Sequence, residues 1–161
     1  MVASLNQHFP VRDQFPNMEN SRIRTLTAST TITAEQHDGQ TLLMGASGAA
    51  LTFTLPAASG TGAKFKFRVS VVNTSNYVIQ VANSTDVMAG GVIFNTDDAS
   101  NAVQGFETAA SSDTITLNGT TTGGVNKGDW VELEDIASGI WGVTGLLTGS
   151  GTEATPFSAA V

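Results

Sequence analysis

The sequence contains no cysteine and only two histidines among its 161 residues. The absence of thiols excludes a disulfide scaffold, a thiolate metal site and a cysteine nucleophile. His8 and His37 are the only imidazoles that could serve as a catalytic base, and His37 stands in EQHDGQ, which has the composition of an exposed turn. No nucleophile elbow or comparable signature accompanies them. We therefore predict a protein that is not an enzyme and that uses no cofactor.

Charged residues are also scarce, at 13% of the chain against about 25% in an ordinary globular protein. The net charge of −7 is uneven, because residues 1–24 hold three arginines against two acids, whereas residues 25–161 hold four basic residues against twelve acids. Such an acidic body offers no run of lysine or arginine to nucleic-acid phosphates or anionic lipids. We therefore expect neither a nucleic acid nor a membrane among its partners.

Long apolar runs are missing as well. No stretch approaches the roughly 18 apolar residues of a membrane span. The first residues, MVASLNQHFPVRDQFP, lack the basic and apolar regions of a secretory signal peptide. The sequence therefore indicates neither a membrane span nor export by that route.

The pattern that is present has a period of two. In ALTFTLP (50–56) and KFKFRVSVV (64–72), apolar residues alternate with polar ones, as is typical of half-buried strands. Turn-forming clusters separate such segments, and none shows the apolar spacing of a long helix. Roughly eight to ten strands are predicted, enough for a sandwich or a jelly roll. The expected fold is therefore all-β, a single β-sandwich or jelly-roll-like domain.

The two ends of the chain differ from this body. Residues 1–23 are predicted to form an extended N-terminal arm, since prolines follow Phe9 and Phe15 and disfavour helix there. Residues 24–147 are predicted to form the sandwich body, and residues 148–161 a short C-terminal arm.

The segment PAASGTGAKFKFRV (56–69) has some features of a phosphate-binding loop. Such a loop needs a lysine directly after a glycine, then serine or threonine, and a following helix. Here Lys64 follows an alanine, Phe65 follows the lysine, and an alternating strand comes next. We therefore interpret the segment as a turn between two strands, in which glycines supply the positive φ angles.

Carboxylates are candidates for a calcium site. Glu132 and Glu134 alternate in one predicted strand and share a face, with Asp129 and Asp135 on either side, and FNTDDASN (94–101) holds two adjacent aspartates. Oxygen ligands of this kind suit calcium, but neither group matches the twelve-residue helix-flanked loop. A solvated strand face is the favoured interpretation, and a calcium site stays open. Paired acids also suit glycoside hydrolysis, but acids are too abundant here to indicate it.

The order of these segments resembles a family of tailed-bacteriophage head decoration (cement) proteins. The segments that carry the resemblance are ITAEQHDGQTLLMG (32–45), LTFTLPAASGTGAKFKFRV (51–69), VIQVANSTDVMAGGV (78–92), SDTITLNGTTTGGVNKGDWVELEDI (112–136) and SGIWGVTGLLTGSGTEATPF (138–157). The resemblance implies a small β-rich structural protein, made in the bacterial host cytoplasm, that binds the outer capsid surface of the virion. It also implies a homotrimer whose partner is the phage major capsid protein.

An aromatic, proline-containing arm is suited to gripping neighbouring subunits. We expect its apolar residues to anchor it and its arginines to pair with acidic capsid groups. These candidate capsid-binding residues are Leu5, Phe9, Val11, Arg12, Phe15, Met18, Arg22 and Arg24. The alternative function is a receptor-binding β domain of a phage tail fibre or spike, which would also be β-rich and trimeric.

Overall fold

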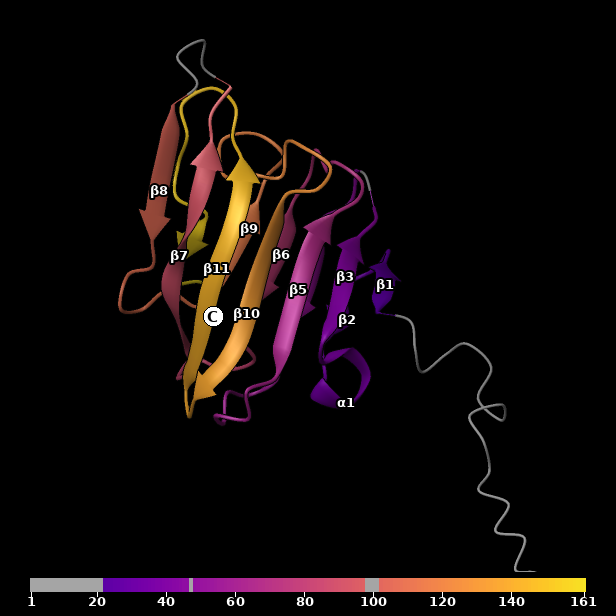
Figure 1. Ribbon diagram of the computed structural model, residues 1–161, viewed down its shortest axis with the longest axis vertical. Helices are drawn as coiled ribbons and strands as arrows, with labels where there is room; N and C mark the ends of the chain where they lie inside the picture. The colour runs from indigo at the N-terminus through magenta and orange to yellow at the C-terminus, as the bar shows by residue number, and fades with distance from the viewer. Residues whose placement is uncertain (1–21, 47, 98–101) are drawn as a thin grey trace, which may run out of the picture.

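Twelve strands and one short helix make up the part of the chain that the computed structural model describes, residues 22–46, 48–97 and 102–161 (Figure 1). In chain order the elements are β1 (Ile23–Leu26), β2 (Thr30–Thr31), α1 (Ala34–His37), β3 (Gln40–Met44), β4 (Leu51–Thr54), β5 (Lys64–Val69), β6 (Tyr77–Gln80), β7 (Val87–Asn95), β8 (Val103–Glu107), β9 (Thr114–Leu117), β10 (Trp130–Ala137), β11 (Ile140–Thr148) and β12 (Phe157–Ser158).

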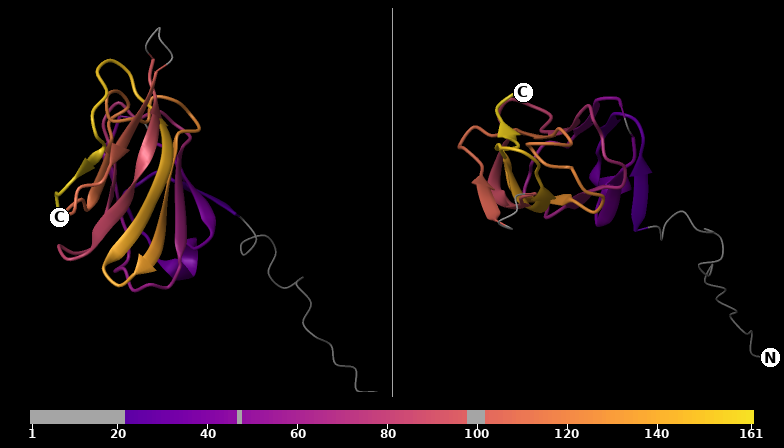
Figure 2. Two further views of the ribbon diagram at one scale, coloured as in Figure 1. Left: turned by 60° about the vertical axis from the view of Figure 1, so that its left-hand side comes forward. Right: turned by 90° about the horizontal axis from the view of Figure 1, so that it is seen from above.

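The strands form two sheets that pack face to face (Figure 2). Sheet A has the strand order β1-β3-β5-β10-β11-β7-β8, and sheet B has the order β12-β9-β6-β4-β2. The prediction of an all-β sandwich is therefore confirmed.

The first half of the chain is wound as a coil. From β1 to β6 the strands belong alternately to sheet A and sheet B, and each lies parallel to the preceding strand of its own sheet. The antiparallel hairpin of β10 and β11 then lies between β5 and β7 in sheet A. These parallel pairs distinguish the sandwich from a jelly roll, whose sheets are antiparallel.

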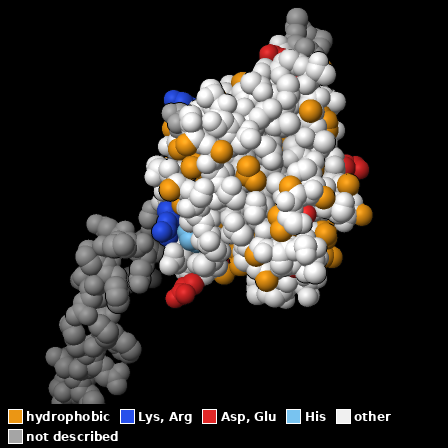
Figure 3. Space-filling view, turned by 180° about the vertical axis from the view of Figure 1, so that it is seen from behind, with side chains coloured by type: hydrophobic (Ala, Val, Ile, Leu, Met, Phe, Trp, Pro, Cys, Tyr) orange, Lys and Arg blue, Asp and Glu red, His pale blue; other side chains and the backbone are white. Residues whose placement is uncertain are grey.

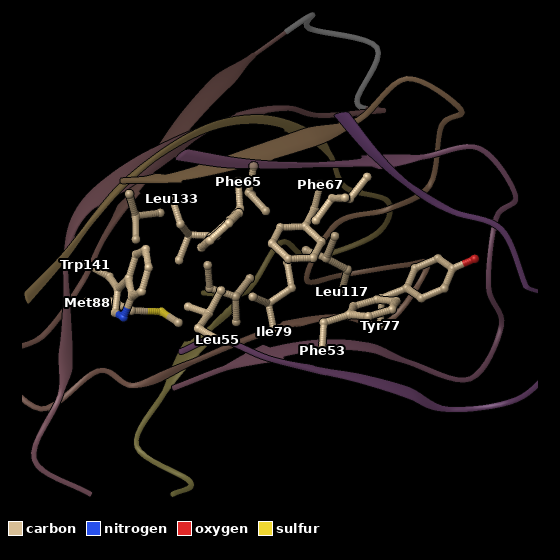
Figure 4. Close-up of a cluster of buried hydrophobic side chains, with 14 of the residues drawn as sticks. Phe53, Leu55, Phe65, Phe67, Tyr77, Ile79, Met88, Leu117, Leu133 and Trp141 are labelled. Carbon is tan, nitrogen blue, oxygen red and sulfur yellow. The ribbon is translucent and has the colours of Figure 1, made fainter. Parts of the chain in front are cut away.

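Alternating burial explains the core. In β5, Phe65 and Phe67 are fully buried, whereas Lys66 and Arg68 point to the opposite face. Inward-facing residues of both sheets meet in one apolar cluster (Figure 4). Across the two layers, the rings of Phe53 and Phe67 lie 5.6 Å apart, and within sheet A those of Phe65 and Trp141 lie 5.6 Å apart. Aromatic side chains of this size dominate the stabilising burial of apolar surface.

The predicted C-terminal arm packs onto the sandwich. Its strand β12 pairs with β9 at the edge of sheet B, and Phe157 contributes to the core. The carboxylate of Asp113 accepts backbone N–H bonds from Ala160 at 2.8 Å and Val161 at 3.3 Å. The final residues are therefore held by specific hydrogen bonds.

Helices contribute little to the described part of the molecule, as the sequence predicts. The four residues of α1 are the only helix there, and no described helix has the length and apolarity needed to cross a bilayer.

Candidate interaction face

The phosphate-loop-like segment binds an anion, but the anion is a side chain of the same chain. The backbone N–H groups of Ser59, Gly60 and Thr61 donate to the carboxylate of Asp135 at 2.7–3.2 Å. The Thr61 hydroxyl donates to it at 2.7 Å. Successive N–H groups that converge on one anion form a nest. The segment is therefore a turn between β4 and β5, as predicted, and its donors are already occupied.

The protonation of Asp135 follows from these contacts. Burial raises the pKa of its carboxyl group, but the hydrogen bonds from Thr61, Gly60 and Ser59 lower it by more, so the pKa lies below the ordinary value. The carboxylate is therefore ionised at neutral pH and holds the turn against the end of β10.

The four acids of the candidate calcium cluster point to opposite faces of sheet A. Asp129 and Asp135 are buried on the inner side, whereas Glu132 and Glu134 are half-buried on the outer side and form ion pairs with Lys66 and Lys64 at 3.5 and 3.1 Å. Within the described ranges no three acidic or histidine side chains gather closely enough to hold a metal ion. Of the FNTDDASN aspartates, Asp98 lies outside the described residues.

Asp129 has a role like that of Asp135. Its carboxylate accepts N–H bonds from Thr148 at 2.9 Å and Gly124 at 3.2 Å, and a hydroxyl bond from Thr148 at 3.0 Å. Burial raises its pKa, and these hydrogen bonds only partly offset that effect. Asp129 therefore ties the loop before β10 to the end of β11.

The prediction of an exposed His37 is wrong, because α1 places its side chain in the interior with 1% of its surface exposed. Its Nδ1 lies 3.1 Å from the backbone nitrogen of Thr33. Its Nε2 has no hydrogen-bond partner among the described residues. Burial lowers the pKa of His37, the Thr33 backbone raises it, and the charge of Arg24 lowers it further, so the net shift is downward.

This shift predicts a loss of stability in mild acid. Since the pKa of His37 is lower in the folded protein than in the unfolded chain, the unfolded chain binds a proton first as the pH falls below about 6.5. The free energy of unfolding should therefore decrease over that range. Urea titrations at pH 7.5 and 5.5 should show a smaller loss in His37→Gln than in the wild type. Equal losses would contradict this assignment.

The outer face of sheet A is the main candidate for an interaction face. Two transverse rows of neighbouring side chains cross it, following the strand register. One row is Arg68, Trp130, Leu146, Ile93 and Gly105, and the adjacent row is Lys66, Glu132, Thr144, Gly91 and Glu107. The first row is apolar over its central three strands, and the second carries the charges.

Trp130 of this face contacts a cation. Its ring lies beneath the Lys66 ammonium group, which is 3.8 Å from the ring centroid and also pairs with Glu132. A cation over an aromatic face is attracted by the ring quadrupole. Arg68, the register neighbour of Trp130, has no ion-pair partner in the described part of the chain. Tryptophan and arginine are the residue types enriched among those that dominate protein–protein interfaces.

Exposed apolar side chains also lie on the same face. Five of the six large hydrophobic residues that are exposed in the described structure extend from its outer side, namely Ile23, Ile93, Val103, Ile136 and Leu146. Gly91 and Gly105 leave a shallow hollow of about 520 Å³ between β7 and β8. Figure 3 views the opposite side of the sandwich, where charged side chains lie mainly at the rim. Leu146 and Ile93 are register neighbours beside Trp130, so these three residues form the apolar centre of the row.

The candidate capsid-binding residues of the arm fall into two groups. Leu5, Phe9, Val11, Arg12, Phe15 and Met18 lie outside the described residues. Arg22 and Arg24 are described, and they lie at the start of β1, the edge strand of sheet A. Both are exposed, and neither forms an ion pair with another described residue.

Sequence reasoning missed the outer face of sheet A, although one signal was present. The alternation in KFKFRVSVV and DWVELEDI indicates which residues point outward, but the pairing of β5 with β10 could not be deduced from it. Comparisons with models of protein families, with curated proteins and with solved structures find no match. The fold thus defines an all-β sandwich.

Proposed function

We propose that this protein is a structural virion protein that binds the outer surface of a phage capsid and stabilises contacts between major capsid subunits. The segment resemblance to head decoration proteins supports this proposal. The observation in the fold that favours it most is the position of β1, which continues directly from the N-terminal residues and is the outermost strand in the order of sheet A.

A segment laid along a neighbouring protein gains specificity from the side chains beside it. The unpaired Arg22 and Arg24 flank Ile23 at this edge and suit a partner segment that carries carboxylates. The apolar residues of the arm would then anchor on the same capsid subunit.

Self-association of the protein, proposed as a homotrimer, would place several arms on one platform. Each added attachment then occurs at high local concentration, so weak individual contacts combine into tight binding. The proposed function needs no chemical step, and the protein acts only by holding neighbouring subunits together.

Co-sedimentation with capsids that lack this protein tests the proposal. Deleting residues 1–20 should abolish binding, and Arg22→Glu with Arg24→Glu should weaken it by roughly tenfold or more, because each charge-assisted hydrogen bond contributes about 1.5–3 kcal/mol. Lys127→Glu is the matched control, since Lys127 is also exposed and forms no ion pair with another described residue but lies in the loop before β10.

Unchanged binding of the truncated protein would refute the role of the arm. Antibody labelling of this protein on intact virions distinguishes the proposed function from the alternative, a receptor-binding fibre domain. Copies spread over the head shell support a decoration protein, whereas copies confined to the tail support a receptor-binding fibre domain.

A further inference from the structure

We propose that the outer face of sheet A is the interface between copies of this chain, with the Arg68 side of one copy against the Glu107 side of the next. This inference rests on the self-association included in the proposed function and names the surface through which the copies would contact each other. It can be tested in the purified protein without capsids, so that either proposal can fail alone.

The first argument is the charge pattern across the face. Strand β11 runs along its middle, with β10 and β5 on one side and β7 and β8 on the other. Moving outward from Leu146, one side presents Trp130 and then Arg68, and the other presents Ile93 and then the β8 strand that carries Glu107. The row through Leu146 is therefore apolar at its centre and cationic at the β5 flank, and Glu107 makes the β8 flank anionic. The Lys66–Glu132 and Lys64–Glu134 ion pairs lie beside this row.

Glu107 is available for such a contact. Its strand neighbour Phe106 points inward, where its ring packs at 5.0 Å against Phe94. Glu107 therefore points outward, is exposed, and forms no ion pair with the rest of the described chain. Arg68 and Glu107 thus carry opposite charges on one face, and neither forms an ion pair within the described chain. They are too far apart to meet within one copy, because three strands lie between β5, which carries Arg68, and β8, which carries Glu107.

A second copy turned about an axis along β11 brings these flanks together. Leu146 then meets its equivalent, and Trp130 faces Ile93 of the other copy. Arg68 faces Gly105 of the other copy, and Glu107 of that copy lies two residues further along β8, opposite Lys66 and diagonal to Arg68. Sheets that pack face to face keep their strands within about 30° of each other, which this arrangement allows. This two-fold contact uses both flanks of each copy and makes a dimer, whereas a ring of three would need a different contact that joins the Arg68 flank of each copy to the Glu107 flank of the next.

The projected size of the face approaches that of an ordinary interface. Five strands spaced by about 4.8 Å and five to nine residues long cover on the order of 500 Å² in projection, before the relief of the side chains is counted. A stable interface buries about 800 Å² per partner. The hollow beside Ile93 and Gly105 offers room for a large side chain such as Trp130 of the other copy.

A charge-swap experiment tests the contact by light scattering coupled to size exclusion. The wild type should have a multiple of the 16.6 kDa mass of one chain. Arg68→Glu and Glu107→Arg should each shift the protein to monomer by placing like charges together, and the double variant should restore the wild-type mass. Mixing Arg68→Glu protein with Glu107→Arg protein should restore a dimer, because each copy then meets a copy of opposite charge. A ring of three built from the two variants must hold two copies of the same variant side by side, so one contact between like charges always remains.

Leu146→Glu and Val161→Glu provide a matched pair, because the two residues are 39% and 40% exposed and only Leu146 lies on the face. Leu146→Glu should give monomer, and Val161→Glu should leave the mass unchanged. Circular dichroism confirms that each variant is folded. A monomeric wild type, an unchanged mass in Arg68→Glu and Leu146→Glu, or a monomeric double-swap variant would overturn the proposal.

Discussion

Replacing Asp135 with alanine is expected to lower the free energy of unfolding by about 2–4 kcal/mol, which is a large part of the stability of an ordinary domain. The substitution leaves the N–H groups of Ser59, Gly60 and Thr61 without their acceptor. Each unsatisfied donor costs about 1–3 kcal/mol when it is buried, and water can reach part of this turn. Urea titration followed by tryptophan fluorescence measures the loss.

Asp38→Ala is the matched control, since the exposed Asp38 accepts only one backbone N–H bond, from Lys64 at 2.7 Å. Its replacement should cost less than about 1 kcal/mol. The loss of unfolding free energy in Asp135→Asn should lie between those of Asp135→Ala and Asp38→Ala, because an amide keeps one acceptor oxygen but loses the charge. An Asp135→Ala protein as stable as the Asp38→Ala protein would contradict the role of the nest.

The contribution of Asp135 also has a defined pH dependence. Since its pKa is lower in the folded protein than the ordinary value of 3.8, the carboxylate stabilises the fold above that value and loses this effect as the pH falls below it. The difference between wild type and Asp135→Ala should therefore shrink in acid.

Gly90→Ala is the second substitution for which we expect a severe effect, a loss of at least about 3 kcal/mol. A Cβ atom on Gly90 would lie 2.1 Å from the backbone oxygen of Val143, its register partner in β11. Its φ of +139° is also one that residues with side chains rarely adopt. Backbone cannot move aside as a flexible side chain can, so β7 and β11 would have to separate.

Gly105→Ala serves as its control within the same sheet. A Cβ on Gly105 meets no atom within 4 Å, and its φ lies outside the left-handed region. Its unfolding free energy should stay within about 0.5 kcal/mol of the wild type. The two variants should be compared by thermal and urea unfolding. Equal stability of Gly90→Ala and Gly105→Ala would show that the β7–β11 register is wrong.

The nest also marks a limit of sequence reasoning. The spacing around Lys64 was enough to exclude a phosphate loop, because the motif and the following helix are both local features. The identity of the real anion was not local, since Asp135 lies more than seventy residues further along the chain. Only the pairing of β5 with β10 brings the turn and the carboxylate together.

Some of the candidate site could have been read more fully from the same alternation. In DWVELEDI a period of two places Asp129 and Asp135 on the side of Val131 and Leu133, opposite Glu132 and Glu134. That pattern predicts two buried aspartates in place of one calcium cluster. Buried carboxylates require donors, and here backbone N–H groups of distant loops supply them.

The sequence by itself determined the fold class and the β5 and β10 strands, because alternation and turn chemistry act over a few neighbouring residues. It did not determine the parallel winding of β1 to β6, since alternation specifies which side chains are buried and not which strand lies alongside or in which direction. His37 was misplaced for the same reason, because its burial depends on how α1 packs against distant strands. The outer face of sheet A, with Arg68 at one flank and Glu107 at the other, likewise exists only once strand order and register are set by packing.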